Sequence, residues 1–298
     1  MKVSRREFVK AIGAVSASLM ASGGAVAQVS QSSPVALPAV GLGSWITFNV
    51  GNAPALLRQS AAVVEAFVNE GGGLIDSSPM YGSAQNTIGY ALNSIGHPRS
   101  VYAADKVWTS STNEGPVQIE NSARNWQIDR FDLIQVHNLR NWQDHLDTLF
   151  RMREDGEVTH VGVTTSHGRR HRLLEDILRE QPVDFVQLTY NPVDRAAEGR
   201  LLPLARERGI SVIVNRPFRR GSLTERLEPV PLPAFAREFG ATTWAQLILL
   251  FIKSHPGVTV VIPATTQVEH VRENKAVEKL ANLDDVSRKM IQDAIRSI

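Results

Sequence analysis

The sequence contains no cysteine in its 298 residues. This absence excludes disulfide bonds, thiolate metal ligands, iron–sulfur clusters and a cysteine nucleophile. The sequence also lacks an apolar run of the roughly 20 residues that a membrane-spanning helix needs. An excess of one charge sign is missing too, because 32 Lys and Arg residues face 30 Asp and Glu residues. A near-neutral chain gives no electrostatic case for binding nucleic acid or an anionic membrane, so we expect neither a nucleic-acid partner nor stable membrane insertion.

Two common functional signatures are missing as well. Gly41-Leu42-Gly43 is not followed by the third glycine of the dinucleotide-binding fingerprint. No Gly-x-Ser-x-Gly sequence marks a serine hydrolase.

His167 and His171 have the spacing of two metal ligands on one helix face, but no third ligand lies near them in the sequence. We therefore expect no metal site.

Residues 1–27 have the pattern of an export signal. The pair Arg5-Arg6 lies in a basic start, an Ala/Gly/Ser-rich run covers residues 11–22, and Ala25-Val26-Ala27 forms a small-x-small cleavage site. This order describes an export signal rather than a membrane span, and the arginine pair resembles a twin-arginine signal. We therefore divide the chain into a signal at 1–27, a polar linker at 28–34 and one folded domain at 35–298. The expected partner is the twin-arginine export machinery, and the expected location is the periplasm.

Removal of this signal changes the charge balance. The segment holds four basic residues and one acidic residue, so its loss leaves 271 residues with a formal charge of −1. This length suits one α/β domain. The absence of cysteine agrees with an oxidising compartment.

Short apolar runs alternate eight times with amphipathic stretches after the linker. The runs lack a period of two, as expected of parallel strands buried on both faces. Eight such units favour an α/β fold of the (β/α)8 TIM-barrel type, whose functional groups follow the carboxyl ends of the strands; an open doubly wound sheet is the alternative. The expected strands are Gly41–Trp45, Gly73–Asp76, Val101–Lys106, Leu133–His137, Val158–Thr164, Phe185–Thr189, Ser211–Asn215 and Thr259–Pro263. The expected helices are Leu56–Asn69, Gln85–Ser94, Glu114–Trp126, Trp142–Arg153, Arg170–Arg179, Glu198–Arg208, Thr243–Ser254, Val268–Leu280 and Asp284–Ile298.

Polar side chains stand at the carboxyl ends of the second, third and fourth expected strands. They are Asp76 with the nearby Tyr81, then Lys106, then His137. Taken singly, each has an ordinary structural explanation: a turn cap, loop packing, a lysine that reaches solvent, or a hydrogen-bonded histidine. Because strand ends meet at one mouth of a barrel, we expect the four side chains to converge.

The four residue types make a coherent set for proton transfer. A tyrosine has a pKa near 10, so it is a poor proton carrier at neutral pH unless that pKa shifts. We expect the Lys106 ammonium to lower the pKa of Tyr81 and Asp76 to hold Lys106 in place. His137 would donate a hydrogen bond to a carbonyl oxygen. The set predicts that Tyr81 is a general acid that protonates this oxygen as a hydride reaches the carbon.

The order Asp76-x4-Tyr81-Gly82, Lys106 and His137 resembles the aldo-keto reductase family. The resemblance covers nearly all of the chain after the signal. It implies a (β/α)8 barrel that binds NADP(H) at its mouth, a catalytic tetrad of these four residues and a small carbonyl substrate. Further matching blocks are Ile88-Gly89-Tyr90-Ala91-Leu92, Val161-Gly162-Val163-Thr164, Val186-Gln187-Leu188-Thr189-Tyr190-Asn191-Pro192, Leu202-Pro203-Leu204-Ala205, Val260-Val261-Ile262-Pro263-Ala264-Thr265 and Glu273-Asn274.

The resemblance also implies which residues hold the cofactor and the substrate. Two sets of residues are expected near the nicotinamide and the pyrophosphate, and a third set near the adenosine. Two tryptophans are expected to face the substrate pocket. These are Thr164, Thr165 and Gln187 for the carboxamide; Asn215, Arg216 and Phe218 for the nicotinamide and pyrophosphate; Ala264, Thr265, Thr266, Glu273 and Asn274 for the adenosine; and Trp45 and Trp108 for the substrate.

The sequence departs from the family pattern around the nicotinamide. Many members have Ser-Asn where this chain has Thr164-Thr165. The aromatic residue that often stacks on the nicotinamide is Asn215 in this chain. Phe218 or Arg216 would then have to cover that face.

A second departure concerns the 2′-phosphate that distinguishes NADP from NAD. The Lys-Ser start of the family's phosphate clamp reads Ala264-Thr265, and the family's arginine aligns with His270. Arg272 is a candidate substitute nearby. The expected cofactor is therefore NADP(H), with NAD(H) left open.

These patterns predict an exported NADP(H)-dependent oxidoreductase that reduces an aldehyde or ketone to an alcohol, with Tyr81 as general acid and base. One alternative is a cofactor-binding barrel with a redox-sensing or regulatory role and little turnover. Another is a barrel lyase or isomerase that uses Lys106 as a Schiff-base nucleophile. The identity of the carbonyl substrate and the oligomeric state stay open at this stage.

Overall fold

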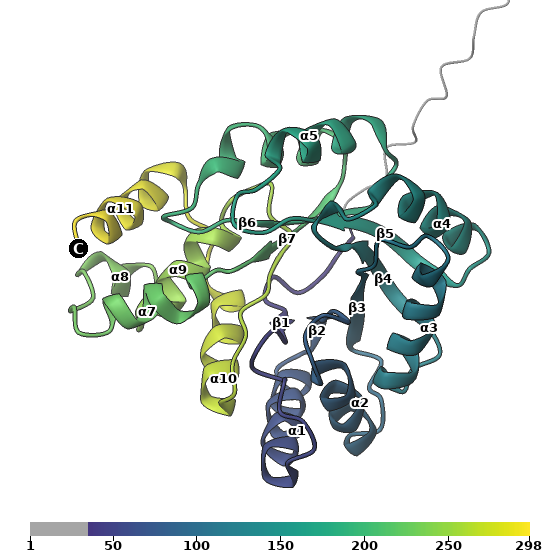
Figure 1. Ribbon diagram of the computed structural model, residues 1–298. Helices are drawn as coiled ribbons and strands as arrows, with labels where there is room; N and C mark the ends of the chain where they lie inside the picture. Colours follow the sequence, from purple (N-terminus) through teal and green to yellow (C-terminus); the bar gives the residue numbers. More distant parts are fainter. Residues whose placement is uncertain (1–34) are drawn as a thin grey trace, which may run out of the picture. The chain divides into compact units, whose positions relative to one another are not determined.

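In the computed structural model, which describes residues 35–298, eight parallel strands pair in chain order from β1 to β8 (Figure 1). The ring closes where Val40 bridges Val261, and the Gly41 amide donates to the Val261 carbonyl at 2.8 Å. The fold is the predicted (β/α)8 barrel; the predicted signal and linker lie outside the described residues. The strands are β1 (Leu42–Gly43), β2 (Gly73–Asp76), β3 (Val101–Val107), β4 (Phe131–Val136), β5 (Val158–Thr164), β6 (Phe185–Thr189), β7 (Ser211–Asn215) and β8 (Val260–Val261).

Alternate residues of each strand face opposite sides, which separates two apolar clusters. Leu74 and Leu133 belong to a small cluster of residues on the strands or directly after them. Their neighbours Ile75 and Ile134 belong to a large cluster shared with the helices. The small cluster therefore fills the inside of the barrel, and the large cluster lies between the strands and the helices. The inner cluster comprises Leu74, Ala104, Leu133, Phe185, Ile213, Val260 and Ile262.

Helices cover the outside of the strands (Figure 1). The expected helix Glu198–Arg208 is instead a 3₁₀ turn at Ala196–Gly199 followed by α6 at Leu201–Glu207. Pro203 explains the difference, because a proline fits the first turn of a helix but not its interior. The helices are α1 (Pro54–Asn69), α2 (Ala84–Ser94), α3 (Glu114–Trp126), α4 (Trp142–Glu154), α5 (His171–Glu180), α6, α7 (Ser222–Leu227), α8 (Phe235–Glu238), α9 (Trp244–Lys253), α10 (Val268–Ala276) and α11 (Asp285–Arg296).

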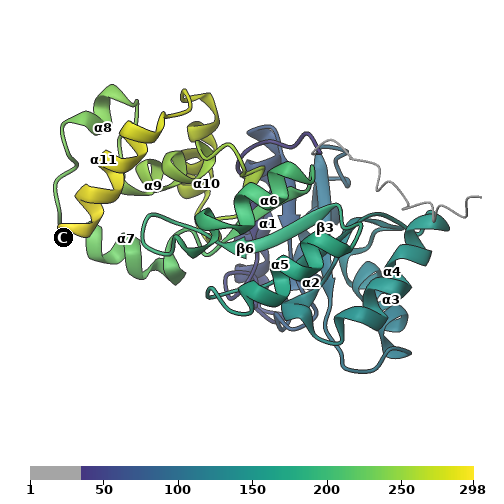
Figure 2. The ribbon, with the colours of Figure 1, turned by 90° about the horizontal axis from the view of Figure 1, so that it is seen from above.

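Two short helices, α7 and α8, were not expected from the sequence. They lie with α9 and α11 at one side of the barrel, as both views show (Figure 2). Each is too short to show a helical period, and Pro229, Pro231 and Pro233 interrupt the chain between them. In the described part of the chain, none of the helices has the length and apolar character needed to span a bilayer.

Candidate active site

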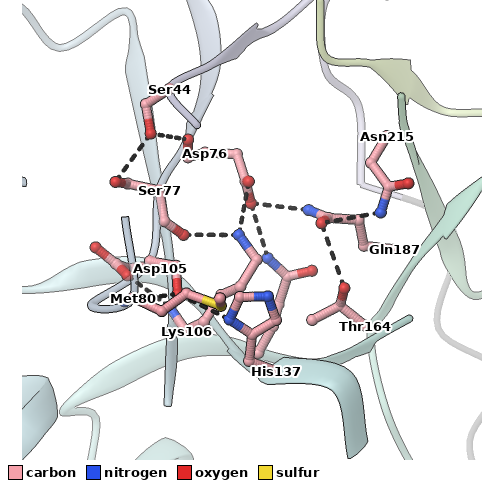
Figure 3. A network of polar contacts seen from close by, with 12 residues as sticks. Ser44, Asp76, Ser77, Met80, Asp105, Lys106, His137, Thr164, Gln187 and Asn215 are labelled. Atoms are coloured by element: carbon pink, nitrogen blue, oxygen red, sulfur yellow. Dashed lines mark hydrogen bonds and ion pairs between the residues drawn. The ribbon is translucent and has the colours of Figure 1, made fainter. Parts of the chain in front are cut away.

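The inward-facing positions of the strands carry polar side chains at their carboxyl ends. Asp76 has the same inward orientation as Leu74, and Lys106 the same as Ala104. The Lys106 ammonium is fully buried and donates to Asp76 Oδ2 at 2.6 Å and to the Ser77 carbonyl at 2.6 Å (Figure 3). Burial alone would lower the pKa of Lys106, but the Asp76 carboxylate outweighs it and holds that pKa above its usual value. Lys106 is therefore a charged ammonium, held in place by Asp76.

The second oxygen of the Asp76 carboxylate is held by two amides. Gln187 Nε2 donates to Asp76 Oδ1 at 2.8 Å (Figure 3), and Gln135 Nε2 donates to the same oxygen at 3.2 Å. Both glutamines are buried and face inward. Gln135 was not among the predicted site residues, although its position two residues before His137 gives it the same inward orientation.

Tyr81 follows β2 in a tight turn. The next residue, Gly82, has φ +63, and a side chain there would collide with Asn49, so the turn requires glycine. The Lys106 ammonium lies 5.2 Å from the centre of the Tyr81 ring, and the His137 ring meets it edge-on with centres 5.8 Å apart. Lys106 and His137 thus lie against Tyr81, and Asp76 is bonded to Lys106.

The predicted direction of the tyrosine pKa shift was wrong. Burial raises the pKa of Tyr81 to about 12, while the Lys106 ammonium acts in the opposite direction but does not overcome burial. Tyr81 is therefore a protonated phenol at neutral pH. Its ammonium neighbour is placed to stabilise the phenolate once the proton has been given away.

His137 begins a 3₁₀ turn directly after β4, rather than ending the strand as predicted. Burial, together with the nearby Lys106 ammonium, lowers the pKa of His137 to about 2. The imidazole is therefore neutral at physiological pH. A neutral ring carries one N–H donor and one acceptor nitrogen.

A cavity of about 1210 Å³ opens over these residues at the carboxyl ends of the strands. It exceeds the roughly 300–1,000 Å³ of ordinary small-molecule pockets, so it has room for a dinucleotide together with a small substrate. Lys106, Trp108 and Thr266 are not on its wall. The predicted residues that line it are Trp45, Asp76, Tyr81, His137, Thr164, Thr165, Gln187, Asn215, Arg216, Phe218, Ala264, Thr265, Glu273 and Asn274.

The two predicted pocket tryptophans have different surroundings. The Trp45 ring lies 6.5 Å from the Tyr81 ring, and the Arg220 guanidinium stacks 4.2 Å above it. The Trp108 ring is covered by Arg140 at 5.3 Å. Trp45 is therefore next to the reacting groups, whereas Trp108 does not reach the cavity. Arg220 lies in the same loop as Arg216 and Phe218, which the family resemblance placed near the nicotinamide and pyrophosphate.

Asn215 belongs to the framework of the site. Its amide nitrogen donates to the Thr165 carbonyl at 2.9 Å and to Gln187 Oε1 at 3.3 Å (Figure 3), and its oxygen accepts from Thr189 at 2.6 Å. Thr164 Oγ1 also donates to Gln187 Oε1, at 3.3 Å. Asn215 thus positions Gln187 in place of an aromatic stacking residue.

Two polar atoms on the cavity wall fit a nicotinamide dinucleotide. Thr165 Oγ1 and Arg216 Nη1 are buried and have no hydrogen-bond partner within residues 35–298. A buried polar atom without a partner is unfavourable, so both positions call for a polar ligand. The hydroxyl can bond a carboxamide, and the guanidinium N–H needs an acceptor such as a phosphate oxygen.

The end of the cavity near Thr265 and His270, where the adenosine is expected, contains few cationic groups. Thr265 Oγ1 lies 3.2 Å from His270 Nδ1 and accepts from the Gln267 amide at 3.0 Å. His270 lines the cavity, whereas Arg272 is exposed and does not. Arg272 is therefore not the phosphate-binding substitute that the sequence indicated. Thr265 and His270 line this part of the cavity instead.

No group of three His, Asp or Glu side chains in residues 35–298 could hold a metal ion. The Schiff-base alternative also finds no support. The Lys106 ammonium is fully buried, is paired with Asp76 and does not line the cavity. A Schiff-base lysine needs an accessible, neutral amine.

Comparisons with known proteins agree with this geometry. The sequence profile of the Aldo/keto reductase family matches residues 39–296. The chain is 27% identical to the methylglyoxal reductase YeaE of Escherichia coli over 83% of this chain and 87% of that protein. It is 24% identical to the NADH-specific methylglyoxal reductase of the same organism, over 89% and 96%. Its fold is similar to a crystal structure of an aldo/keto reductase from Klebsiella pneumoniae in complex with NADP and acetate, with a TM-score of 0.72, 24% identity and coverage of 87% and 92%.

Proposed function

Because this chain belongs to the aldo/keto reductase family, we propose that it is an NADP(H)-dependent oxidoreductase that reduces an aldehyde or ketone to an alcohol. The observation that carries the proposal is the grouping of a protonated Tyr81, a neutral His137 and the buried Asp76–Lys106 pair at one cavity. The relatives named as methylglyoxal reductases make small dicarbonyls the first substrates to test.

In the proposed reduction, each catalytic side chain has a separate role in moving or stabilising the proton. NADPH, when bound, supplies a hydride to the carbonyl carbon. The Tyr81 phenol gives its proton to the carbonyl oxygen, and an N–H of His137 donates a hydrogen bond to the same oxygen. Lys106 stabilises the phenolate that Tyr81 leaves behind, and Asp76 keeps Lys106 charged and in place. In the reverse oxidation, the phenolate takes the proton back.

Residues at the ends of β5, β6 and β7 and on α10 would hold the cofactor. Thr165 and Gln187 would bond the carboxamide, and Arg216 would bond the pyrophosphate with the N–H that has no protein partner in the described chain. Glu273 and Asn274 lie on the adenosine side of the cavity. Because, within residues 35–298, the cavity wall near Thr265 and His270 has no lysine or arginine to pair with a 2′-phosphate, NAD(H) would also be accommodated.

Replacement of Tyr81 by Phe tests this function. We expect the wild type to oxidise NADPH in the presence of methylglyoxal or other aldehydes and ketones. Tyr81→Phe removes the acid and should lower kcat by roughly 10²–10⁴-fold, with an unchanged Kd for NADPH measured by fluorescence. A wild type that binds NADPH but reduces no carbonyl in a broad panel would favour the sensing or regulatory barrel instead.

We also propose that the protein is exported, folded, to the periplasm through the twin-arginine machinery. The support is the Arg5-Arg6 pair, the short apolar run and the Ala25-Val26-Ala27 site. Arg5→Lys combined with Arg6→Lys should retain the protein in the cytoplasm, as checked by cell fractionation. Equal periplasmic amounts of both forms would contradict this proposal.

A further inference from the structure

The turn between Asp76 and Tyr81 carries a side chain that has no role in the proposed chemistry so far. Ser78 is fully buried, and its Oγ lies 2.8 Å from Nδ1 of His137. His137 is 6% exposed and lies on the cavity wall. The contact joins the turn after β2 to the turn after β4.

The other contacts of Ser78 decide which group donates. The Met80 amide donates to Ser78 Oγ at 3.3 Å, so the serine oxygen already accepts a hydrogen bond. Within the described residues, the Ser78 hydroxyl has one acceptor within reach, the His137 nitrogen. A buried hydroxyl proton needs an acceptor. The hydroxyl therefore donates, and Nδ1 accepts.

This direction fixes the position of the remaining ring proton. The ring is neutral, so it carries a single proton. If Nδ1 accepts, that proton lies on Nε2, because the hydrogen bond at one ring nitrogen sets the protonation of the other. No side chain or backbone group of residues 35–298 bonds to Nε2. The N–H is free for a ligand in the cavity.

We propose that Ser78 is a positioning residue that holds His137 in the tautomer with its proton on Nε2, so that the ring donates to the substrate carbonyl oxygen. The opposite tautomer would turn a lone pair toward that oxygen and would remove one of its two donors. The inference rests on the proposed carbonyl reduction for its catalytic consequence. The tautomer itself is a property of the protein alone.

The tautomer can be read without any enzyme assay. In the full-length protein labelled with ¹⁵N-histidine, the ring nitrogen shifts distinguish a protonated from an unprotonated nitrogen, and His137→Gln assigns the resonance. We expect the proton on Nε2 in the wild type and a mixture of tautomers in Ser78→Ala. A wild-type spectrum with the proton on Nδ1 would overturn the proposal.

Kinetics supply the second readout. Because the donor acts on charge that develops in the transition state, Ser78→Ala should lower kcat roughly tenfold, the effect of one lost hydrogen bond, with little change in KM. Ser78→Thr, which keeps the hydroxyl, should restore kcat. Ser211→Ala is the matched control, since it removes a buried hydroxyl that accepts from the Val35 amide at the opposite end of a strand.

The outcomes separate this inference from the proposed function. An unchanged kcat in Ser78→Ala, or an equal loss in Ser211→Ala, would overturn the positioning role. A wild type with the proton on Nε2 that reduces no carbonyl would leave the tautomer established and refute carbonyl reduction. Unchanged NADPH affinity in Ser78→Ala is expected, because the serine does not line the cavity.

Discussion

The two ends of the cavity differ in how their polar groups are satisfied. At the ends of β2, β3 and β4, both oxygens of Asp76 and the ammonium of Lys106 are bonded within the protein. Beside β5 and β7, Thr165 Oγ1 and Arg216 Nη1 are buried without partners in the described chain. The Asp76–Lys106 pair at the catalytic end is thus complete in the protein alone, whereas the two unpartnered atoms at the cofactor end await a ligand. Preorganised catalytic groups need little rearrangement during the reaction, which favours catalysis.

The largest expected effect comes from breaking the Asp76–Lys106 ion pair at the catalytic end. Asp76→Asn leaves the buried Lys106 ammonium without a countercharge, and such losses are worth about 3–5 kcal/mol of unfolding free energy. Urea denaturation measures this. The matched control is Asp293→Asn, which removes an exposed ion pair with Lys289 at 2.7 Å and should change stability by less than about 1 kcal/mol. Similar losses in the two variants would contradict a preorganised ion pair.

At the cofactor end, a substitution should weaken the binding of NADPH rather than lower the stability of the protein. Arg216→Met removes a charged donor to the pyrophosphate, worth about 1.5–3 kcal/mol, so the Kd for NADPH should rise roughly tenfold or more. Unfolding without cofactor should change little, because the Arg216 side chain has an unpartnered buried atom. Arg219→Met is the control: Arg219 pairs with Asp194 at 3.1 Å, so its loss should leave the Kd nearly unchanged.

Most of the fold and the identities of the four catalytic residues could be predicted from the sequence. Asp76, Tyr81, Lys106 and His137 could be predicted because their identities and order in the chain define the chemistry. The contact between Ser78 and His137 could not, because it depends on how two turns pack across the barrel mouth. The direction of the Tyr81 pKa shift was missed for a similar reason, since it depends on the burial of the ring by distant segments.

The short strands and helices show a related limit. β1 and β8 contain two residues each, because the strand pairing ends before the apolar runs do. The helices α7 and α8 have no periodic pattern in the sequence, yet the segment that contains them lines the cavity. Such features depend on the tertiary packing around the segment.

The smallest of the expected effects is a pH dependence that arises at the catalytic end. The unfolded chain protonates His137 near pH 6.5, but the folded protein keeps that pKa at about 2. The unfolded state therefore binds more protons below pH 6.5, so stability falls as the pH falls, by about 2 kcal/mol from pH 7 to pH 5. His137→Gln should remove this part of the slope. Parallel pH profiles for the two proteins would refute the neutral, buried imidazole.

Transfer of deuterium tests the central claim most directly. The full-length protein is mixed in a single turnover with NADPH deuterated at the transferable position and with methylglyoxal or another reactive aldehyde, and the product alcohol is examined by mass spectrometry. The account predicts deuterium on the carbinol carbon in the wild type and its near absence over the same time in Tyr81→Phe. An alcohol without deuterium, or equal transfer by both proteins, would contradict it.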